Sequence, residues 1–312
     1  MGRAISHVVM VVALMASTAY VLQLDDSAPR AKAPVSATAA VQFVPVQVPA
    51  ADTTGREYFI RRHEVIPLGT ATLRLPILMY HYIRPQPSML WDPMGFRLSV
   101  EPDVFNAQLD WLAANGYHTV TFDQIRAYFA GTQALPSRPV VITLDDGYRD
   151  LYTAAYPLLR AHAFTAVAYI VPNFVDRYEY VTRDQILDMD HGGIEIASHT
   201  MNHANLAGMS FGGAMYELVQ SKHWLEGLLG HSILDFAYPS GKFNALTVYE
   251  VQQAGYDTAV TEQESLMHSR DNRYTWARTR VGGGESLADF ITNLGVSMPS
   301  VTIQSVSVKP GV

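Results

Sequence analysis

Short apolar runs alternate with amphipathic segments along the chain from about residue 73 onward. The runs have the length of buried strands, and most of the segments between them place apolar residues at helical spacing. The strand candidates are Leu75–Tyr80, His118–Phe122, Pro139–Leu144, Thr165–Val171, Ile194–Ser198, Ile233–Tyr238, Thr258–Thr261 and Ala277–Val281. The helix candidates are Asp103–Asn115, Leu151–Ala163, Gly213–Leu229, Leu246–Ala254 and Leu287–Leu294.

This alternation of strands and helices predicts a parallel sheet with helices packed on its outside. About seven or eight parallel strands in a single catalytic domain are typical of a distorted (β/α) barrel, which is the α/β fold that we expect. An open doubly wound sheet is the alternative. In either architecture, the chemistry is expected at the carboxyl ends of the strands.

The amino-terminal segment has the pattern of an export signal. Arg3 precedes a mostly apolar run over Ala4–Leu24, and residues 17–19 offer a small-residue cleavage site. The apolar run continues past that site, so residues 1–24 are predicted to be either a signal peptide or an uncleaved membrane anchor. Both alternatives predict an extracytoplasmic protein, either secreted or attached to the membrane through this segment.

The rest of the chain divides by composition. Residues 25–55 are rich in Ala and Pro and show no helical or strand period, which predicts an extended linker. The catalytic domain is expected over residues 56–297. Residues 298–312 form a carboxyl-terminal tail, and their alternation of Val and Ser favours an edge strand over disorder.

Composition limits the chemistry that is available. The net charge of −7, without a basic cluster, gives no support to nucleic-acid binding. The chain has no cysteine, which excludes disulfides, thiolate metal sites and cysteine nucleophiles. Any metal must therefore be bound by His, Asp or Glu, a ligand set that suits Zn, Co, Ni or Fe. A monomer is the default expectation.

Two adjacent carboxylates follow the apolar run Pro139–Leu144. Asp145 and Asp146 precede Gly147, at the expected carboxyl end of a strand. Neighbouring like charges repel each other unless a cation or a proton compensates them. A metal can bind one carboxylate while the other serves as a base. The alternative is a solvent-exposed Asp-Asp-Gly turn with no chemical role.

Two histidines follow another strand candidate. His199 and His203 are four residues apart, so they share one face if a helical turn begins there. This spacing can chelate one ion, although two unrelated surface histidines would look the same. Together with one aspartate they make a set of two histidines and one carboxylate. Such a set leaves coordination positions open for water and substrate.

These segments resemble motifs of the polysaccharide deacetylase family, which is the NodB-homology domain of carbohydrate esterase family 4. Leu144–Gly147 resembles the first motif and His199–His203 the second. Phe236–Gly241 resembles the third motif, in the variant of the branch that deacetylates poly-N-acetylglucosamine. Ala277–Val281 lies where the fourth motif belongs. Leu78–His81 resembles the segment that precedes the first motif in that branch, whose barrel is circularly permuted.

The resemblance implies roles for the matching residues. Asp145 would be the general base that activates a water molecule. Asp146, His199 and His203 would bind a divalent metal, usually zinc. His81 would be the general acid that protonates the leaving amine, although a histidine at a strand end is also compatible with ordinary packing. The substrate implied is an N-acetylated polysaccharide.

Further roles follow from the resemblance and from one departure. The backbone N–H of Tyr148 would stabilise the tetrahedral oxyanion. The family's third motif usually carries an arginine that orients the base, but this chain has Ala237 there. Arg278 or Arg280 can supply the guanidinium from the next strand, and we favour Arg278 as the partner of Asp145. Ordinary surface ion pairs are the alternative for both arginines.

Two ring-bearing residues of the third motif, one aromatic and one proline, are candidates for substrate binding. Tyr238 and Pro239 can line a sugar-binding groove, although aromatic residues at strand ends are more often part of the core. The segment Pro85–Phe96, which contains Trp91, is predicted to be a loop beside the site.

The prediction is a metal-dependent hydrolase that removes N-acetyl groups from N-acetylglucosamine-containing polysaccharide, either exopolysaccharide or peptidoglycan. One alternative keeps the metal site but changes the substrate, as in an amidase or esterase. Another is a non-catalytic surface protein that binds carbohydrate on the same scaffold. The presence of both Asp145 and Asp146 favours the enzyme, because a binding module has no need of a base.

Overall fold

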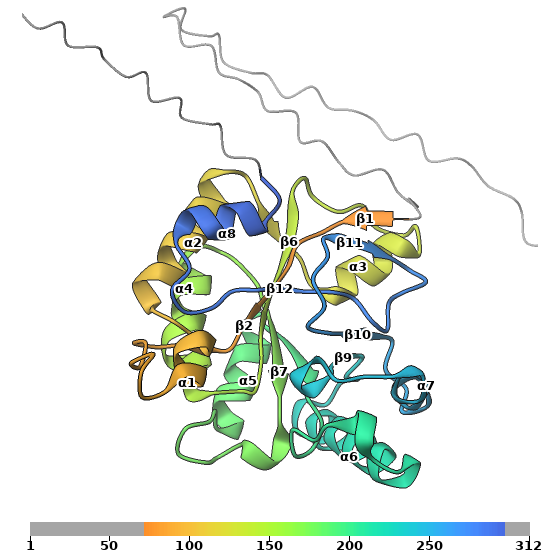
Figure 1. The fold of residues 1–312 in the computed structure, drawn as a ribbon. Helices are drawn as coiled ribbons and strands as arrows, with labels where there is room; N and C mark the ends of the chain where they lie inside the picture. Colours follow the sequence, from red (N-terminus) through yellow and green to blue (C-terminus); the bar gives the residue numbers. More distant parts are fainter. Residues whose placement is uncertain (1–71, 297–312) are drawn as a thin grey trace, which may run out of the picture. The chain divides into compact units, whose positions relative to one another are not determined.

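The computed structural model describes residues 72–296 (Figure 1). The predicted signal or anchor, the predicted linker and the predicted carboxyl-terminal tail all lie outside the described residues. Within residues 72–296, no helix is long and apolar enough to cross a membrane.

A curled parallel sheet forms the centre of the described domain. Its order is β10-β9-β8-β7-β6-β2-β12, and every neighbouring pair is parallel. The strands are β2 (Ile77–Tyr80), β6 (Pro139–Leu144), β7 (Val167–Ile170), β8 (Glu195–Ser198), β9 (Asp235–Ala237), β10 (Thr258–Val260) and β12 (Thr279–Arg280). A parallel bridge between Val260 and Trp276 brings the chain that leads into β12 beside β10. This arrangement confirms the predicted distorted (β/α) barrel.

Helices surround this sheet, as Figure 1 shows. They are α1 (Pro93–Leu98), α2 (Pro102–Ala114), α3 (Phe122–Phe129), α4 (Tyr156–Ala161), α5 (Arg183–His191), α6 (Phe211–Leu229), α7 (Ala245–Gln253) and α8 (Leu287–Asn293). The π-helical turn η1 (Leu151–Ala155) leads into α4. The remaining strands are β1 (Thr72–Arg74), β3 (Tyr82–Ile83), β4 (Ser99–Val100), β5 (His118–Thr119) and β11 (Met267–Ser269).

Alternation along the strands separates two apolar cores. Ile142 and Leu144 of β6 belong to the larger core, which includes residues of the surrounding helices. Val141 belongs to the second core, together with Tyr169 of β7 and Ala197 of β8. Side chains alternate between the two faces of a strand, and this alternation continues into the residues just beyond its end.

That alternation determines which side chains meet at the carboxyl ends of the strands. Asp145 follows Val141 by four residues, His81 follows Ile77 by four, and His199 follows Ala197 by two. Val141, Ile77 and Ala197 all belong to the second core. Asp145, His81 and His199 therefore lie on the same faces of their strands as the second core, just past the strand ends. This is why they come together at one end of the sheet.

Three helices were not anticipated in the sequence. Helices α3 and α5 each begin with a complete capping box, at Thr121 and Thr182. The capping at Thr121 also shortens the predicted strand His118–Phe122, because Phe122 is already helical. Helix α1 lies inside the segment predicted as a loop. Its start is defined by the side chain of Asp92, which accepts from the Gly95 N–H, and by Pro93 in the first turn.

Candidate active site

The chain turns sharply where β6 ends. Asp146 and Gly147 both adopt left-handed conformations, with φ of 73° and 72°. A non-glycine residue rarely adopts this conformation, so the turn must be held by its surroundings. Both Asp145 and Asp146 are buried, which contradicts the alternative of a solvent-exposed Asp-Asp-Gly turn.

Asp145 is held by the guanidinium of Arg278, which lies just before β12. Arg278 donates to both carboxylate oxygens of Asp145 at 2.7 Å. It also donates to Thr143 Oγ1 and to the Thr261 carbonyl, each at 3.0 Å. Both partners are buried, and Arg278 has no exposed surface. Bidentate geometry of this kind fixes the plane of the carboxylate as well as its charge.

The charge of Asp145 follows from this pairing. Burial alone would raise the pKa of the carboxyl, but the Arg278 guanidinium outweighs burial and the pKa lies below its ordinary value. Asp145 is therefore ionised at neutral pH. Arg280 is directed elsewhere and pairs with Glu262, so the structure brings Arg278 and not Arg280 to the position that Ala237 leaves without a guanidinium.

Asp146, His199 and His203 form a compact cluster. Their potential ligand atoms lie within 4.8 Å of one another. Asp146 Oδ1 is 3.4 Å from His199 Nε2 and 3.3 Å from His203 Nε2. Among residues 72–296, this buried oxygen has no hydrogen-bond partner. His199 Nδ1 is 2.8 Å from the Ala237 carbonyl, which fixes the orientation of the ring and directs Nε2 toward Asp146.

This geometry fits a divalent metal ion. Two ligand atoms about 2.0–2.1 Å from one ion in tetrahedral geometry lie about 3.3 Å apart. The two separations in the cluster, 3.3 and 3.4 Å, agree with that value. The orphaned oxygen of Asp146 and the imidazole held by a backbone carbonyl are both expected at a metal site. The described residues therefore contain a donor set suited to zinc or a similar ion.

The loop that carries the two histidines is held by helix α6. Glu217 of that helix is buried and accepts from both the backbone N–H and the side-chain amide of Asn202, at 2.9 and 2.7 Å. The Glu217 carbonyl accepts from the Met201 N–H at 3.1 Å. Thr200 and His203 have φ of 64° and 57°. The clamp at Glu217 thus stabilises a loop with two left-handed residues.

A pocket of about 540 Å³ opens over this cluster. Its lining includes Asp146, His199 and His203, with His81 beside them. His81 is buried, and its Nδ1 has no hydrogen-bond partner in the described part of the chain. Burial lowers the pKa of His81, and the neighbouring carboxylates of Asp145 and Asp146 oppose that shift. The position of His81 in this pocket agrees with the permuted motif order that the sequence suggested.

Tyr148 also lines the pocket, and its backbone N–H is directed away from the local ladder. Tyr148 forms an isolated antiparallel bridge with Tyr180. The flanking hydrogen bonds are donated by Arg149 to the Glu179 carbonyl and by Val181 to the Gly147 carbonyl. In this pattern the paired residues do not exchange hydrogen bonds with each other. The Tyr148 N–H therefore does not bond across this ladder.

The predicted sugar-binding face at Tyr238 and Pro239 is not present in this structure. Both residues are buried. The Tyr238 ring packs against Phe236 and Phe243, and its hydroxyl donates to the Tyr274 carbonyl. A ring without exposed surface cannot present its face to a sugar, so we correct this assignment. Tyr238 belongs to the larger core, which was the alternative for aromatic residues at strand ends, and Pro239 is buried next to it in the chain.

The segment that was expected beside the site does line the pocket, although part of it forms helix α1 and not a loop. Met94, Arg97 and Leu98 of α1 line the pocket, and the ion pair between Glu262 and Arg280 lies at the same pocket. The sequence Asp92-Pro93 is a recognisable helix start and could have indicated that the segment was not a passive loop.

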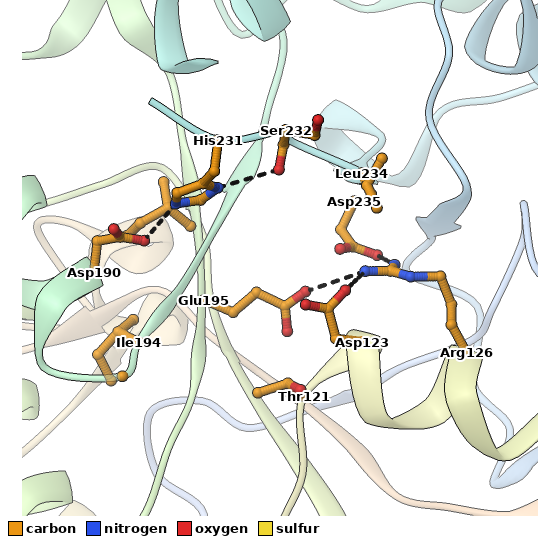
Figure 2. A pocket seen from close by; sticks show the side chains of 12 residues that line it. Thr121, Asp123, Arg126, Asp190, Ile194, Glu195, His231, Ser232, Leu234 and Asp235 are labelled. Atoms are coloured by element: carbon orange, nitrogen blue, oxygen red, sulfur yellow. Dashed lines mark hydrogen bonds and ion pairs between the residues drawn. The ribbon is translucent and has the colours of Figure 1, made fainter. Parts of the chain in front are cut away.

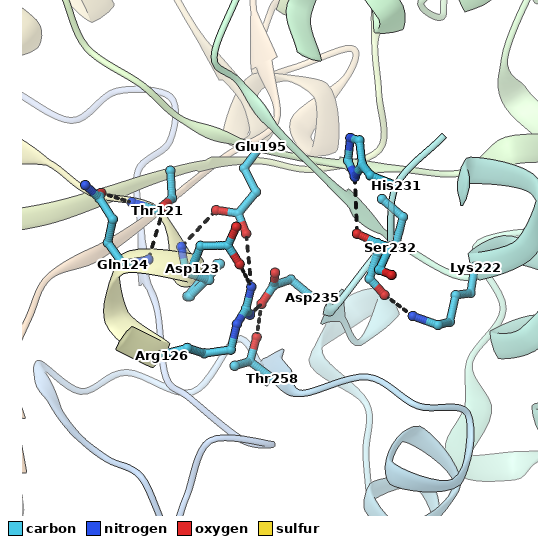
Figure 3. Close-up of polar contacts among 12 residues, drawn as sticks. Thr121, Asp123, Gln124, Arg126, Glu195, Lys222, His231, Ser232, Asp235 and Thr258 are labelled. Atoms are coloured by element: carbon cyan, nitrogen blue, oxygen red, sulfur yellow. Dashed lines mark hydrogen bonds and ion pairs between the residues drawn. The ribbon is translucent and has the colours of Figure 1, made fainter. Parts of the chain in front are cut away.

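A second polar pocket, of about 420 Å³, lies at the amino-terminal ends of β8 and β9 (Figure 2). Arg126 of α3 forms ion pairs there with Asp123, Glu195 and Asp235. Figure 3 shows that Thr258 also contacts Asp235. All three carboxylates of this group meet the same guanidinium; Glu195 and Asp235 are enclosed, whereas the Asp123 side chain is largely exposed.

Comparison with known proteins agrees with the fold. Residues 132–259 match the family model "Polysaccharide deacetylase". YxkH of Bacillus subtilis (strain 168), whose name places it in the polysaccharide deacetylase class, is 30% identical over 217 residues, covering 70% of this chain and 75% of that protein. The poly-β-1,6-N-acetyl-D-glucosamine N-deacetylase of Escherichia coli (strain K12) is 26% identical over 236 residues, which cover 62% of this chain and 35% of that enzyme.

A solved structure shows the same architecture. The deacetylase PplD of Streptococcus pyogenes, determined in complex with acetate, superposes with a TM-score of 0.66 at 26% identity and covers 71% of this chain and 98% of that one. The chain belongs to the polysaccharide deacetylase family, the NodB-homology domain of carbohydrate esterase family 4. Its enzyme class is accordingly that of a deacetylase, which is a hydrolase.

Proposed function

We propose that the protein is a metal-dependent N-deacetylase of N-acetylglucosamine-containing polysaccharide. The observation that carries this proposal is the pairing of two environments at the carboxyl ends of the strands, on the adjacent residues Asp145 and Asp146. Asp145 is ionised and oriented by Arg278, and beside it Asp146, His199 and His203 form a donor set for one divalent ion. Hydrolysis of an amide needs a base, an acceptor for the oxyanion and a proton for the leaving nitrogen.

Each need has a residue at this end of the sheet. A divalent ion bound by Asp146, His199 and His203 lowers the pKa of water and polarises a carbonyl group. Asp145 accepts the proton of the water molecule that attacks the acetamide carbon. The Tyr148 N–H donates to the oxyanion of the tetrahedral intermediate. His81 donates a proton to the nitrogen as the C–N bond breaks, so that acetate and a free amine are the products.

The substrate class rests on the relatives together with the pocket. The Escherichia coli relative acts, by its name, on poly-β-1,6-N-acetyl-D-glucosamine. The pocket of about 540 Å³ has the exposed residue Met94 in its lining, so it opens on the surface. We therefore favour an extracytoplasmic polymer, either exopolysaccharide or peptidoglycan, with the protein secreted or attached to the membrane by its amino-terminal segment. A monomer is sufficient, because all the proposed residues come from one chain.

Acetate release tests the proposal. The full chain is incubated with short N-acetylglucosamine oligomers of β-1,4 and β-1,6 linkage, with zinc, cobalt or a chelator added in parallel. We expect metal-dependent acetate release, and at least a hundredfold loss of kcat in Asp145→Asn, since a positioned general base contributes about 10²–10⁴-fold. The exposed Asp271→Asn is the matched control and should leave the rate unchanged.

Other results would select the alternatives. Release that is equally fast in Asp145→Asn would remove the base from the mechanism. Binding of the oligomers with no acetate release under any metal would indicate a carbohydrate-binding protein on this scaffold. Turnover of small acetyl esters or amides, without turnover of any glycan, would indicate an amidase or esterase with another substrate.

A further inference from the structure

One short segment of the described chain carries an unusual number of exposed apolar side chains. Met89, Leu90, Trp91 and Met94 all lie on the surface, and Trp91 is 84% exposed. Tryptophan is highly buried on average in folded proteins. A cluster of exposed apolar residues marks a site that contacts another molecule more often than a single exposed residue does. These four residues are called the Trp91 platform below.

The backbone under the Trp91 platform is held in one conformation. The N–H groups of Trp91 and Asp92 both donate to the Ser88 carbonyl, at 3.1 and 2.8 Å. Asp92 then caps α1 by accepting from the Gly95 N–H at 2.8 Å. The far end of α1 is tied to the domain, because the Gly283 N–H donates to the Arg97 carbonyl at 3.2 Å. The aromatic ring is thus presented by an ordered turn, which lowers the entropy cost of binding.

The platform is continuous with the pocket of the candidate active site. Met94 is 64% exposed and also lines the pocket that contains His81, Asp146 and His203. Leu98, one helical turn further along α1, lines the same pocket. Trp91 precedes Met94 by three residues. A chain that leaves the pocket on this side therefore meets the platform first.

The chemistry of the platform favours a neutral sugar chain over other occupants. Asp92 is the only charged residue between Met89 and Met94, and Arg97 is the only basic residue of α1, whereas segments that bind anionic lipid surfaces are rich in basic residues. Four side chains also fall well short of the 20–30 residues a side that a stable protein interface commonly uses. An exposed indole next to apolar side chains suits the C–H faces of sugar rings, which pack against aromatic faces.

We propose that the Trp91 platform binds the sugar residues next to the one whose acetyl group is removed. This inference rests on the proposed function, because it needs a polymeric substrate that occupies the pocket. The platform then determines how strongly the protein distinguishes a polymer from a short oligomer. Trp91 and Met94 make substrate contacts outside the reacting centre, so their effect is on binding of the chain.

Binding measured apart from turnover tests this proposal. Asp145→Asn protein is titrated calorimetrically with N-acetylglucosamine oligomers of two and six residues, with and without Trp91→Ala. We expect Trp91→Ala to weaken hexamer binding roughly three- to tenfold, by loss of an aromatic contact, and to leave dimer binding unchanged. Trp91→Phe should retain most of the affinity. The control Tyr216→Ala removes another exposed aromatic residue, from α6, and should change neither affinity.

Turnover separates this proposal from the proposed function. With Asp145 intact, Trp91→Ala should raise KM for the hexamer while kcat at saturation stays within twofold. Acetate release by the wild type with no effect of Trp91→Ala on hexamer binding or KM would refute the platform and leave the deacetylase standing. Equal losses for dimer and hexamer would also refute it, because the contact would then lie inside the pocket.

Oligomers that neither bind nor release acetate would overturn both proposals for this substrate class. Binding to phosphatidylglycerol vesicles that Trp91→Ala abolishes, with hexamer affinity intact, would assign the platform to a membrane.

Discussion

At the scale of single residues, the site depends on which strand supplies each group. The guanidinium that orients Asp145 comes from Arg278, just before β12, while Ala237 at the end of β9 contributes its backbone carbonyl to His199. Arg278 thus orients the carboxylate of Asp145, while residue 237, where the family motif usually has an arginine, orients a histidine through its backbone. The small side chain of Ala237 is also buried in the second core, and its carbonyl helps to orient a metal ligand. The departure from the family's third motif is therefore compensated by a neighbouring segment.

The turn after β6 requires a left-handed backbone at Gly147, and this requirement can be tested by mutation. Gly147 has φ of 72°, and a Cβ there would lie 3.1 Å from Ile170 Cδ1. Gly147→Ala should lower the free energy of unfolding by about 1–2 kcal/mol through its left-handed backbone, and more where Ile170 cannot move. It should also reduce acetate release, because Gly147 lies between Asp146 and Tyr148. Urea unfolding and an activity assay measure the two effects.

Gly131→Ala provides the matched control for this prediction. Gly131 has φ of 75°, but no atom of the described part of the chain lies within 4 Å of a Cβ placed there. The free energy of unfolding of Gly131→Ala should fall by about 1 kcal/mol from backbone strain alone, and the variant should keep full activity. If both variants lost the same stability and both kept full activity, the contact with Ile170 and the position beside the site would have no measurable consequence.

At the scale of elements, the ligand loop and helix α6 form one unit. The loop makes its bonds to Glu217 through the backbone and side chain of Asn202, one residue before His203. The unit therefore restrains the second histidine through the chain next to it. A metal site benefits from such restraint, because ligands already in place lose less entropy when the ion binds.

Replacing Glu217 should weaken metal binding. Glu217→Ala removes both acceptors of Asn202 and should lower zinc affinity roughly 10–100-fold, as is typical when groups supporting metal ligands are lost. Glu217→Gln keeps one oxygen acceptor, so it should lower zinc affinity by a smaller factor. Competition with a chromophoric chelator measures the affinity independently of activity.

Glu226→Gln is the control for this measurement, because Glu226 lies on the same helix but contacts Lys222 and Ile233. Unchanged zinc affinity in folded Glu217→Ala would show that the clamp does not position the histidines. Weakened affinity in Glu226→Gln as well would indicate a general effect of α6 on stability.

The elements also show what could be predicted from the sequence. Each strand of the barrel was anticipated because its apolar run is continuous and local, and Asp145, Asp146, His199 and His203 were found because each pair is contiguous with a strand end. Helices α3 and α5 were missed, although their capping boxes at Thr121 and Thr182 are visible in the sequence. The capping residues carried a signal that the apolar spacing of these short helices did not.

Other features depend on tertiary contacts and leave no local signal. The burial of Tyr238 results from Phe236, Phe243 and the carbonyl of Tyr274, and a strand-end aromatic residue does not show which way its ring turns. Glu217 lies 14 residues beyond His203 in an ordinary helix, so its contact with Asn202 could not be read from spacing. Pairing Arg278 with Asp145 was predictable only because a family motif indicated that a guanidinium was needed.

At the scale of the whole molecule, the two ends of the barrel have different tasks. The carboxyl ends of the strands hold the candidate active site, while the amino-terminal ends hold the network of Arg126 with Asp123, Glu195 and Asp235. In barrels of this type, polar residues at the amino-terminal end contribute to stability. Its two most enclosed acids come from the first residues of β8 and β9, so the network connects adjacent strands to helix α3.

This network should make stability depend on pH through Glu195. Burial and the nearby Asp235 raise the pKa of Glu195 well above its ordinary value, although Arg126 opposes them. A raised pKa in the folded state means that the folded protein holds this proton more tightly than the unfolded chain. The resulting stabilisation is fully present below the unfolded pKa of about 4.3 and is lost as pH rises through the folded pKa. The loss amounts to about 1.4 kcal/mol for each unit by which the pKa is raised.

Glu195→Gln should remove that dependence, since glutamine is neutral at every pH and its oxygen can still accept from the Phe122 N–H. The free energy of unfolding of the wild type minus that of Glu195→Gln should therefore fall between pH 4.5 and pH 8, as urea unfolding across this range would show. Glu179→Gln, at an exposed position, should give a flat difference. A wild-type advantage that grows with pH would mean that Arg126 holds Glu195 ionised, and that the guanidinium outweighs both burial and Asp235 in this network.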